Sequence, residues 1–288
     1  MTSTAQTIRV LVVGAGAVGC FYASRLQTDR TSNPSVEVSL VCRSNYEPIA
    51  ERGVILKTRS FGDYTFAPKH VFSSVAEAAK VKDVWDYVVV TTKALPDVSD
   101  DSAVIEPVVT SGKSAIVLIQ NGVGVEEPYR KRFSHNPILS AVTVISAEQV
   151  EPGVIINASM NPSSVLSNGT GNARMSVDPE LRHHLRETML EVFRAAEAVL
   201  GRPVPPTLAT ADKILTSTER NTGGKPSMLL DWERGAVMEL EVILGNPIRL
   251  ARAKGVDMPR LQTMYALLKM AQTRRDEDKG KNKNKARL

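Results

Sequence analysis

The sequence predicts an α/β protein in which an N-terminal parallel-sheet domain is followed by an all-helical C-terminal domain. Three observations support this fold class. Short apolar strands alternate with helical stretches through the first half, a glycine-rich turn follows the first strand, and the second half changes to helical periodicity. We expect the boundary at Glu151-Pro152-Gly153, with domains over 1–150 and 151–275 and a basic disordered tail over 276–288.

The strands of the first half are continuous apolar runs. Such runs are typical of a sheet that is covered on both faces, and the strand–helix–strand order favours a parallel, doubly wound arrangement. The expected strands are Ile8–Val13, Val36–Cys42, Tyr87–Thr91 and Ala115–Ile119, with Ala141–Ile145 as a further candidate and Ala17–Leu26 as the first helix.

The second half carries helix signals. Asp178 followed by Pro179 predicts an N-cap and a first helical residue, and Gly201 ends the apolar 3–4 spacing that follows. Two further helices are expected over Met238–Lys254 and Arg260–Gln272.

The composition is ordinary for a globular protein, with 288 residues, 42% hydrophobic and 23% charged. Cys20 and Cys42 cannot form a disulfide framework and indicate buried thiols in a reducing compartment. The sequence contains no apolar run of ~20 residues and no signal-peptide pattern, so we expect neither a membrane span nor secretion. A cytoplasmic location follows as the expectation.

The net charge of +5 is concentrated near the C-terminus, in Lys279, Lys281, Lys283, Lys285 and Arg287. Clustered charge of this kind usually marks a solvated tail, and 5% aromatic residues are too few for base-stacking platforms. Nucleic-acid binding is therefore a weak alternative. The final Ala286-Arg287-Leu288 resembles a peroxisomal address, which makes the peroxisome an alternative location, with chance similarity as the other explanation.

The first strand runs directly into a G-x-G-x-x-G loop that opens a helix, formed by Gly14, Ala15, Gly16, Ala17, Val18 and Gly19. In a Rossmann-type fold, the first glycine permits the tight turn, the second lets the backbone approach a pyrophosphate, and the third lets helix and strand pack closely. The helix N-terminus adds amide donors for the phosphates. The loop therefore predicts a dinucleotide site.

The end of the second strand predicts which dinucleotide is bound. NAD-binding folds usually place a carboxylate there, but this strand ends in Cys42-Arg43-Ser44-Asn45. The Arg43 guanidinium can pair with a 2′-phosphate, and Ser44 and Asn45 can hydrogen-bond it. We expect NADP(H); the alternative is that Arg43 is an ordinary surface arginine.

Several further segments, taken in order, resemble the ketopantoate reductase (2-dehydropantoate 2-reductase) family from about residue 8 to 272. They are Val90-Thr91-Thr92-Lys93-Ala94, Gln120-Asn121-Gly122-Val123-Gly124, Asn157-Ala158-Ser159-Met160-Asn161-Pro162, Lys225-Pro226-Ser227-Met228-Leu229-Leu230-Asp231 and Glu239-Leu240-Glu241. The resemblance implies a Rossmann N-domain, a helical substrate and dimerisation domain, and an active site between them. It also implies NADPH-dependent reduction of ketopantoate or a related 2-oxo acid or ketone, a step toward pantothenate.

The resemblance assigns roles to particular residues. It implies that Lys93 contacts the cofactor and that Asn121 lies near both nicotinamide and substrate. Asn157 and Asn161, four residues apart on one helix face, and Ser227 would bind substrate. Glu239 would hold the substrate hydroxyl and the catalytic group. The simpler alternatives are a solvated lysine, an Asn-Gly turn, a solvated helix face and a helix N-cap at Ser227.

One position departs from the family. The family's proton donor is a lysine one turn before the first helix asparagine, and that position here is Gly153. No lysine occurs between Lys131 and Lys213, and only 36 positions separate Asn121 from Asn157. Two explanations are open: an internal deletion, such as an error in the assigned splice sites, or a genuinely shortened homologue. A catalytically impaired NADP(H)-binding homologue is accordingly the alternative function.

The remaining expectations concern partners. The four histidines show no metal-ligand spacing, and we expect no metal site. We expect a small-molecule 2-oxo acid as the binding partner, no nucleic acid and no membrane, with a homodimer as a further option.

Overall fold

The computed structural model describes residues 7–27, 34–58, 61–82, 84–141, 153–205, 209–220, 222 and 225–285, with 153–156 and 280–285 described by backbone alone. The chain divides into two compact units. The first consists of Met1–Gln120 and Val125–Ala147, and the second of Asn121–Gly124 and Glu148–Leu288.

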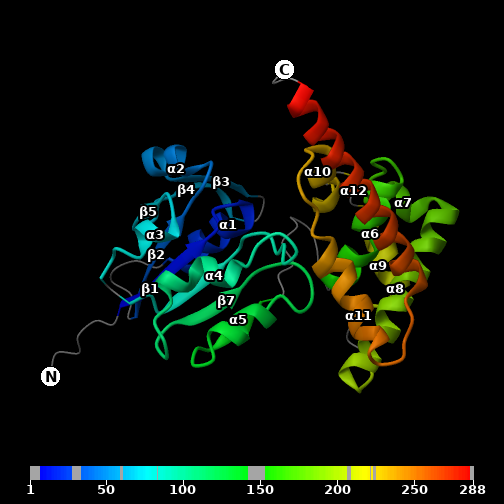
Figure 1. The fold of residues 1–288 in the computed structure, drawn as a ribbon, viewed down its shortest axis with the longest axis horizontal. Coiled ribbons are helices and arrows are strands. Elements are labelled where there is room, and N and C mark those ends of the chain that lie inside the picture. Colours follow the sequence, from blue (N-terminus) through cyan, green and yellow to red (C-terminus); the bar gives the residue numbers. More distant parts are fainter. Residues whose placement is uncertain are drawn as a thin grey trace. The chain divides into compact units, whose positions relative to one another are not determined.

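Within the described part of the first unit, six parallel strands form one sheet in the order β5-β2-β1-β6-β7-β8. Figure 1 labels four of its strands, β1, β2, β5 and β7. The strands are β1 (Thr7–Val13), β2 (Ser35–Val41), β5 (Val71–Phe72), β6 (Tyr87–Val90), β7 (Ala115–Leu118) and β8 (Ile138–Ser140). Counted along the sheet, this is the 3-2-1-4-5-6 order of the doubly wound Rossmann fold. The predicted fold class is confirmed.

Side chains of the sheet are buried on both faces. Val10 and Val12 belong to one apolar cluster, whereas Leu11 and Val13 belong to another. Successive side chains of a strand point to opposite faces, so the two clusters are the two faces of the sheet. This double burial explains why the strands lack polar alternation.

Helices and a hairpin connect the strands of the first unit. They are α1 (Ala17–Leu26), α2 (Tyr46–Arg52), the antiparallel pair β3 (Val54–Thr58) and β4 (Gly62–Phe66), α3 (Val75–Ala78), α4 (Asp101–Ile105), the 3₁₀ turn η1 (Glu106–Val108) and α5 (Glu127–Arg132).

Four of the predicted strands and the first helix agree with the structure to within one residue. The hairpin and β5 were not expected from the sequence. The candidate strand Ala141–Ile145 lies almost wholly outside the described residues, and the last strand of the sheet is β8, which ends just before it.

The described part of the second unit is helical. Its elements are α6 (Gly153–Leu166), α7 (Asn172–Val177), α8 (Pro179–Leu200), α9 (Ala211–Thr218), α10 (Ser227–Glu233), the π-helical turn η2 (Glu241–Gly245), α11 (Asn246–Arg252) and α12 (Pro259–Lys285). Helix α6 packs against α8, α10 and α12 and is buried from Ala158 to Val165.

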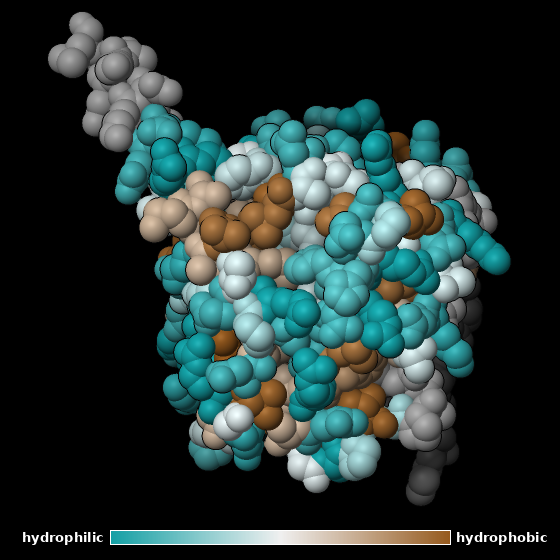
Figure 2. Space-filling view, turned by 90° about the vertical axis from the view of Figure 1, so that its right-hand side faces the viewer, coloured by the Kyte–Doolittle hydropathy of each residue, from teal (hydrophilic) through white to brown (hydrophobic). Residues whose placement is uncertain are grey.

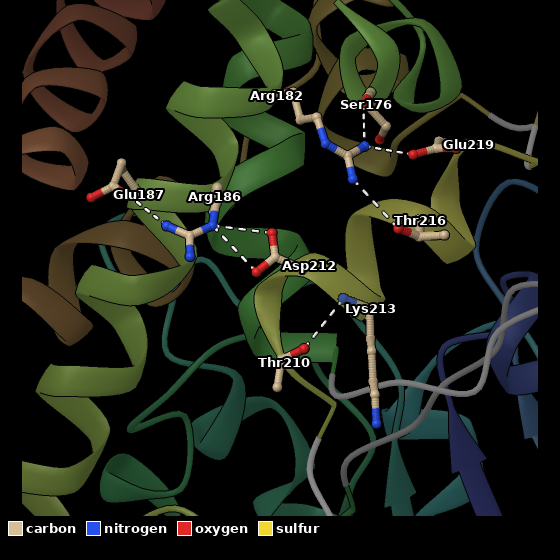
Figure 3. Close-up of polar contacts among 9 residues, drawn as sticks. All are labelled: Ser176, Arg182, Arg186, Glu187, Thr210, Asp212, Lys213, Thr216 and Glu219. Atoms are coloured by element: carbon tan, nitrogen blue, oxygen red, sulfur yellow. Dashed lines mark hydrogen bonds and ion pairs between the residues drawn. The ribbon is translucent and has the colours of Figure 1, made fainter. Parts of the chain in front are cut away.

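Helix α8 begins and ends as predicted. The Asp178 carboxylate accepts a hydrogen bond from the Leu181 amide at 2.9 Å, and Gly201 closes the helix with a φ of 66°. Figure 3 shows how two arginines of α8 hold α9: Arg182 donates to Glu219 at 2.5 Å, and Arg186 donates to Asp212 at 3.0 Å.

The expected helix over Met238–Lys254 is interrupted. Residues 236–239 are not helical, and a π-helical turn precedes α11. Pro247 has no amide hydrogen, and its ring crowds the carbonyl four residues earlier, so the regular α-helical hydrogen bond is lost at this point. The sequence pattern identified the apolar spacing but not the change of helix type.

The expected disordered tail over 276–288 is also wrong in part, because α12 continues through Lys285. Arg275 donates to the Ala236 carbonyl at 2.9 Å, and Lys279 donates to the Gly235 carbonyl at 2.6 Å. These contacts fix the helix against the loop after α10. The tripeptide 286–288 lies outside the described residues.

The surface of the second unit that Figure 2 shows is mostly hydrophilic, with separate hydrophobic groups among the hydrophilic ones. Exposed apolar side chains of this unit include Leu267 and Met270 on α12. None of the described helices is both long and apolar enough to cross a lipid bilayer.

Candidate functional site

The glycine loop follows β1 and is packed against the end of β6. Gly14 has a φ of 111°, and a Cβ there would lie 2.9 Å from both Thr91 Oγ1 and the Thr92 amide nitrogen. The Thr91 hydroxyl donates to the Gly14 carbonyl. Only glycine fits this position, as the loop motif predicted.

The other two glycines differ in their surroundings. A Cβ on Gly19 would lie 2.0 Å from the Gly14 carbonyl oxygen, so Gly19 allows α1 to pack onto the loop. Gly16 has no atom within 4 Å of its Cβ position and is exposed, as is Ala17. No side chain caps the N-terminus of α1, so its first amides are presented in an open cradle that suits a pyrophosphate.

The end of β2 lies beside this cradle, because the Gly14 amide donates to the Val41 carbonyl at 3.2 Å. Arg43 and Ser44 are both exposed. The Asn45 side-chain amide donates to the Ala15 carbonyl, which ties the segment after β2 to the glycine loop. Arg43 and Ser44 are therefore accessible to a ligand, whereas the side-chain amide of Asn45 holds the glycine loop.

Lys93 is exposed on the segment that follows β6. The neighbouring Thr92 hydroxyl donates to Asp101 at 2.8 Å, and the Gln120 side-chain amide donates to the same carboxylate at 3.2 Å. Asp101 thus joins the carboxyl ends of β6 and β7, the sheet edge at which ligands bind in this fold class. No local pattern in the sequence marks Asp101 as part of this edge.

In the second unit, all five predicted catalytic and substrate residues lie in one hydrogen-bonded row. The Asn121 amide donates to Glu239 Oε2 at 3.1 Å, and Asn157 donates to Asn121 Oδ1 at 3.3 Å. The Asn161 amide then donates to Asn157 Oδ1 at 3.3 Å and to Ser227 Oγ at 3.4 Å. The row draws on α6, α10, the loop before η2 and the segment that follows β7.

Glu239 sets the direction of this row. The Asn121 NH₂ group donates to Glu239 and its oxygen accepts from Asn157, so these two contacts fix which way the Asn121 amide faces. Asn157 is oriented by its hydrogen bond to Asn121, and Asn161 by its hydrogen bond to Asn157. Glu239 is 7% exposed and Asn161 is 3% exposed, whereas Asn121 and Ser227 are exposed. The row therefore offers polar groups of fixed orientation to a small ligand.

Two of the simpler alternatives can now be judged. Ser227 is not an N-cap, because α10 begins at Ser227 itself and no side chain caps that end. Asn157 and Asn161 do not form a solvated face, because they bond to each other and to neighbouring elements. Gly153 is the first residue of α6, one turn before Asn157, and carries no proton donor.

The other acidic residues near the row are structural. Glu241 Oε2 accepts from Arg249 at 2.8 Å, and Glu241 Oε1 accepts from Lys269 at 2.9 Å and from the Tyr265 hydroxyl. Burial acts to raise the pKa of Glu241, but these hydrogen bonds outweigh it and lower the pKa to about 2. Asp231 is buried, at 8% exposure. Among the described residues, no group of three or more acidic, His or Cys side chains could hold a metal ion.

Comparison with known proteins shows one family along most of the chain. The family model for ketopantoate reductase PanE/ApbA matches residues 10–169, and the model for its C-terminal part matches residues 152–272. A crystal structure of 2-dehydropantoate 2-reductase from Methylococcus capsulatus is similar, with a TM-score of 0.75 and 28% identity, over 93% of this chain and 98% of that one.

Two further relatives and one solved structure are similar over most of the chain. An uncharacterised Saccharomyces cerevisiae protein is 29% identical over 94% of this chain and 96% of its own length. A 2-dehydropantoate 2-reductase from Nostoc is 23% identical over 90% and 93%. D-mandelate dehydrogenase, solved with NADH and anilino(oxo)acetate, shares the fold at a TM-score of 0.70 and 15% identity, covering 93% of this chain and all of that one.

The lengths of these alignments bear on the missing lysine. The yeast alignment extends over 344 positions and the Nostoc alignment over 318, although the whole chain has 288 residues. Both relatives therefore carry residues within the aligned region that have no counterpart here. This agrees with the short interval between Asn121 and Asn157 in the sequence.

Proposed function

The chain belongs to the ketopantoate reductase family, and on this basis we propose that it is an NADPH-dependent reductase of ketopantoate or of a related small 2-oxo acid or ketone. Members of this family are NADP(H)-dependent oxidoreductases. The observation that carries the proposal is the oriented row from Ser227 through the asparagines to Glu239, which the family pattern alone would not guarantee.

The first unit would hold the cofactor. NADPH, when bound, supplies the hydride. The open cradle at Gly16 and the uncapped start of α1 would take the pyrophosphate, and Arg43 with Ser44 would take the 2′-phosphate. Lys93, on the same sheet edge, would contact the cofactor further along.

The second unit would hold the substrate. The amides of Asn157 and Asn161 and the Ser227 hydroxyl can bind a carboxylate or hydroxyl of a small keto acid. Asn121, fixed by Glu239, would present its polar group near the reacting carbonyl. Pre-oriented groups of this kind stabilise developing charge because they need no reorganisation during the reaction.

The missing lysine favours a second candidate function. A positioned general acid contributes about 10²–10⁴-fold to such a reaction, and position 153 supplies none. We therefore propose that turnover of ketopantoate by this chain is very slow, and that NADP(H) binding without efficient turnover is the alternative function. A homodimer also stays a prediction, which sedimentation analysis checks.

The test compares binding with turnover. NADPH binding is followed by its fluorescence, and turnover by NADPH oxidation at 340 nm with ketopantoate. We expect binding with little turnover, and Gly153→Lys should not restore it, because a lysine at the first residue of α6 stands on a frayed helix end. Family-like turnover of the unaltered chain would show that another group donates the proton. Sequencing the transcript across codons 150–160 would show whether coding residues are missing.

A further inference from the structure

The segment Asn121–Gly124 directly follows the β7 region in sequence but belongs to the second unit. Val123 is held there through both of its backbone polar groups. Its amide donates to the Val242 carbonyl at 2.9 Å, and its carbonyl accepts from the Asn246 side-chain amide at 2.7 Å. These two bonds fix the chain two residues after Asn121.

The backbone of the segment also packs directly on the π-helical turn. Gly122 has a φ of 99°, and a Cβ there would lie 2.4 Å from Val242 Cβ. A side chain at this position would separate the segment from η2. The close approach therefore depends on glycine, and the Val123 hydrogen bonds depend on that approach.

Asn246 is itself oriented by charge. Arg249 donates to Asn246 Oδ1 at 2.6 Å, which leaves the Asn246 NH₂ group to face Val123. Arg249 also donates to Glu241 Oε2 at 2.8 Å, and Glu241 begins the π-helical turn two residues after Glu239. Asn121 is thus connected to Glu239 in two ways. One is their direct hydrogen bond, and the other runs through Val123, Asn246, Arg249 and Glu241.

We propose that Asn246 is a positioning residue that keeps Asn121 in hydrogen-bonding reach of Glu239. Asn121 is then set by the unit that carries Asn157, Asn161 and Ser227, although it follows a strand of the sheet. This inference rests on the proposed function, in which Asn121 acts on the substrate. A Gly-Asn-Pro sequence at 245–247 is the signal that marks the position, and by itself it indicates only a turn.

The test uses Asn246→Asp. This change keeps the side-chain size and the oxygen that Arg249 binds, but it replaces the donor to Val123 with a second oxygen. We expect amide hydrogen exchange at Val123 to accelerate about tenfold, the factor that corresponds to one hydrogen bond of ordinary net strength. Asn246→Ala removes the donor without adding charge and should give the same direction of change.

Asn136→Asp is the matched control. The Asn136 side chain also donates to backbone carbonyls, of Thr110 at 2.8 Å and Ser114 at 2.7 Å, but it lies in the first unit. This variant should lower the unfolding temperature without changing exchange at Val123. Unchanged exchange in both Asn246 variants, or equal acceleration in Asn136→Asp, would overturn the inference.

Kinetics separate positioning from general stability. In folded Asn246→Asp, kcat for NADPH-dependent reduction should fall about tenfold while KM for NADPH stays within about twofold, because Asn121 is misplaced but the cofactor cradle is intact. Asn136→Asp should leave kcat and KM unchanged. If the unaltered chain reduces no 2-oxo acid, the proposed function fails, and the exchange measurement still decides whether Asn246 holds the segment.

Discussion

Replacing Gly16 with alanine should weaken NADPH binding roughly tenfold to hundredfold and leave the fold intact. Gly16 lies at a φ of −77° and a ψ of −175°, which alanine adopts without strain, and no atom lies within 4 Å of its Cβ position. The added methyl group would instead occupy the open cradle that we assign to the pyrophosphate. The variant therefore separates the role of the loop in binding from its role in packing.

The expected magnitudes differ for the two properties. The change from glycine to alanine at a helix N-cap costs at most about 1 kcal/mol of folding stability. Loss of one charge-assisted hydrogen bond to the pyrophosphate costs about 1.5–3 kcal/mol, which is roughly a tenfold to hundredfold increase in Kd. Fluorescence titration with NADPH and thermal unfolding measure the two effects on the same sample.

Gly171→Ala is the matched control for this prediction. Gly171 is the N-cap of α7, with a φ of −72°, a ψ of 157°, no side-chain cap and no atom within 4 Å of its Cβ position. It should show the same small loss of stability with unchanged NADPH affinity. Wild-type affinity in Gly16→Ala would refute our placement of the pyrophosphate.

Four further predictions follow from the structure. Gly19→Ala should prevent stable folding, because its Cβ would lie 2.0 Å from the Gly14 carbonyl oxygen; soluble yield and circular dichroism check this. Arg43→Asp should reverse or abolish a preference for NADPH over NADH, and equal affinities in the unaltered protein would contradict the assignment of Arg43. The pKa of Glu241 is about 2 in the folded chain against an ordinary value of 4.5, so its network stabilises the fold above pH 4.5 and loses this effect as the pH falls toward 2. Glu241→Gln should accordingly lose about 1–2 kcal/mol at pH 7, since solvent screens its exposed partners Arg249 and Lys269, and little at pH 2, measured by urea denaturation. An N-terminally tagged chain should relocate when Leu288 is deleted if the last tripeptide is a peroxisomal address, and a diffuse signal unaffected by the deletion would leave the cytoplasm as the location.

The sequence predicted the sheet because its strands are short, apolar and buried on both faces. The apolar run from Ile8 to Val13, between a polar N-terminal segment and a glycine loop, is typical of a buried strand. The β3–β4 hairpin escaped prediction because it pairs outside the main sheet, and because Ile55 is apolar but 63% exposed, so the sequence of β3 does not show the alternation that its burial shows. Helix α12 extends beyond its predicted end because Arg275 and Lys279 donate to the carbonyls of Ala236 and Gly235. Local residue spacing does not predict these contacts.

The sequence predicted the glycines of the candidate site but not Asn246 or Asp101, for a physical reason. Gly14, Gly16 and Gly19 follow from local chain geometry, which a short motif records directly. Asn246 matters through contacts with Val123, 123 positions away, and no local pattern encodes such a pair. Asp101 is similar, because it joins Thr92 and Gln120 only after the two strands are aligned.

The hydrogen-bonded row is present and the family lysine is absent, and this difference bears on how the lysine was lost. The oriented row from Ser227 to Glu239 depends on every member, because each amide is aligned by its neighbour. Gradual loss of function would be expected to remove such members singly and at scattered positions. Here the row is complete, while the lysine position is occupied by Gly153 and only 36 positions separate Asn121 from Asn157. A single deletion between Asn121 and Asn157 would account for the missing lysine and for residues that the longer relatives carry, whereas slow drift would need to spare five interdependent polar residues.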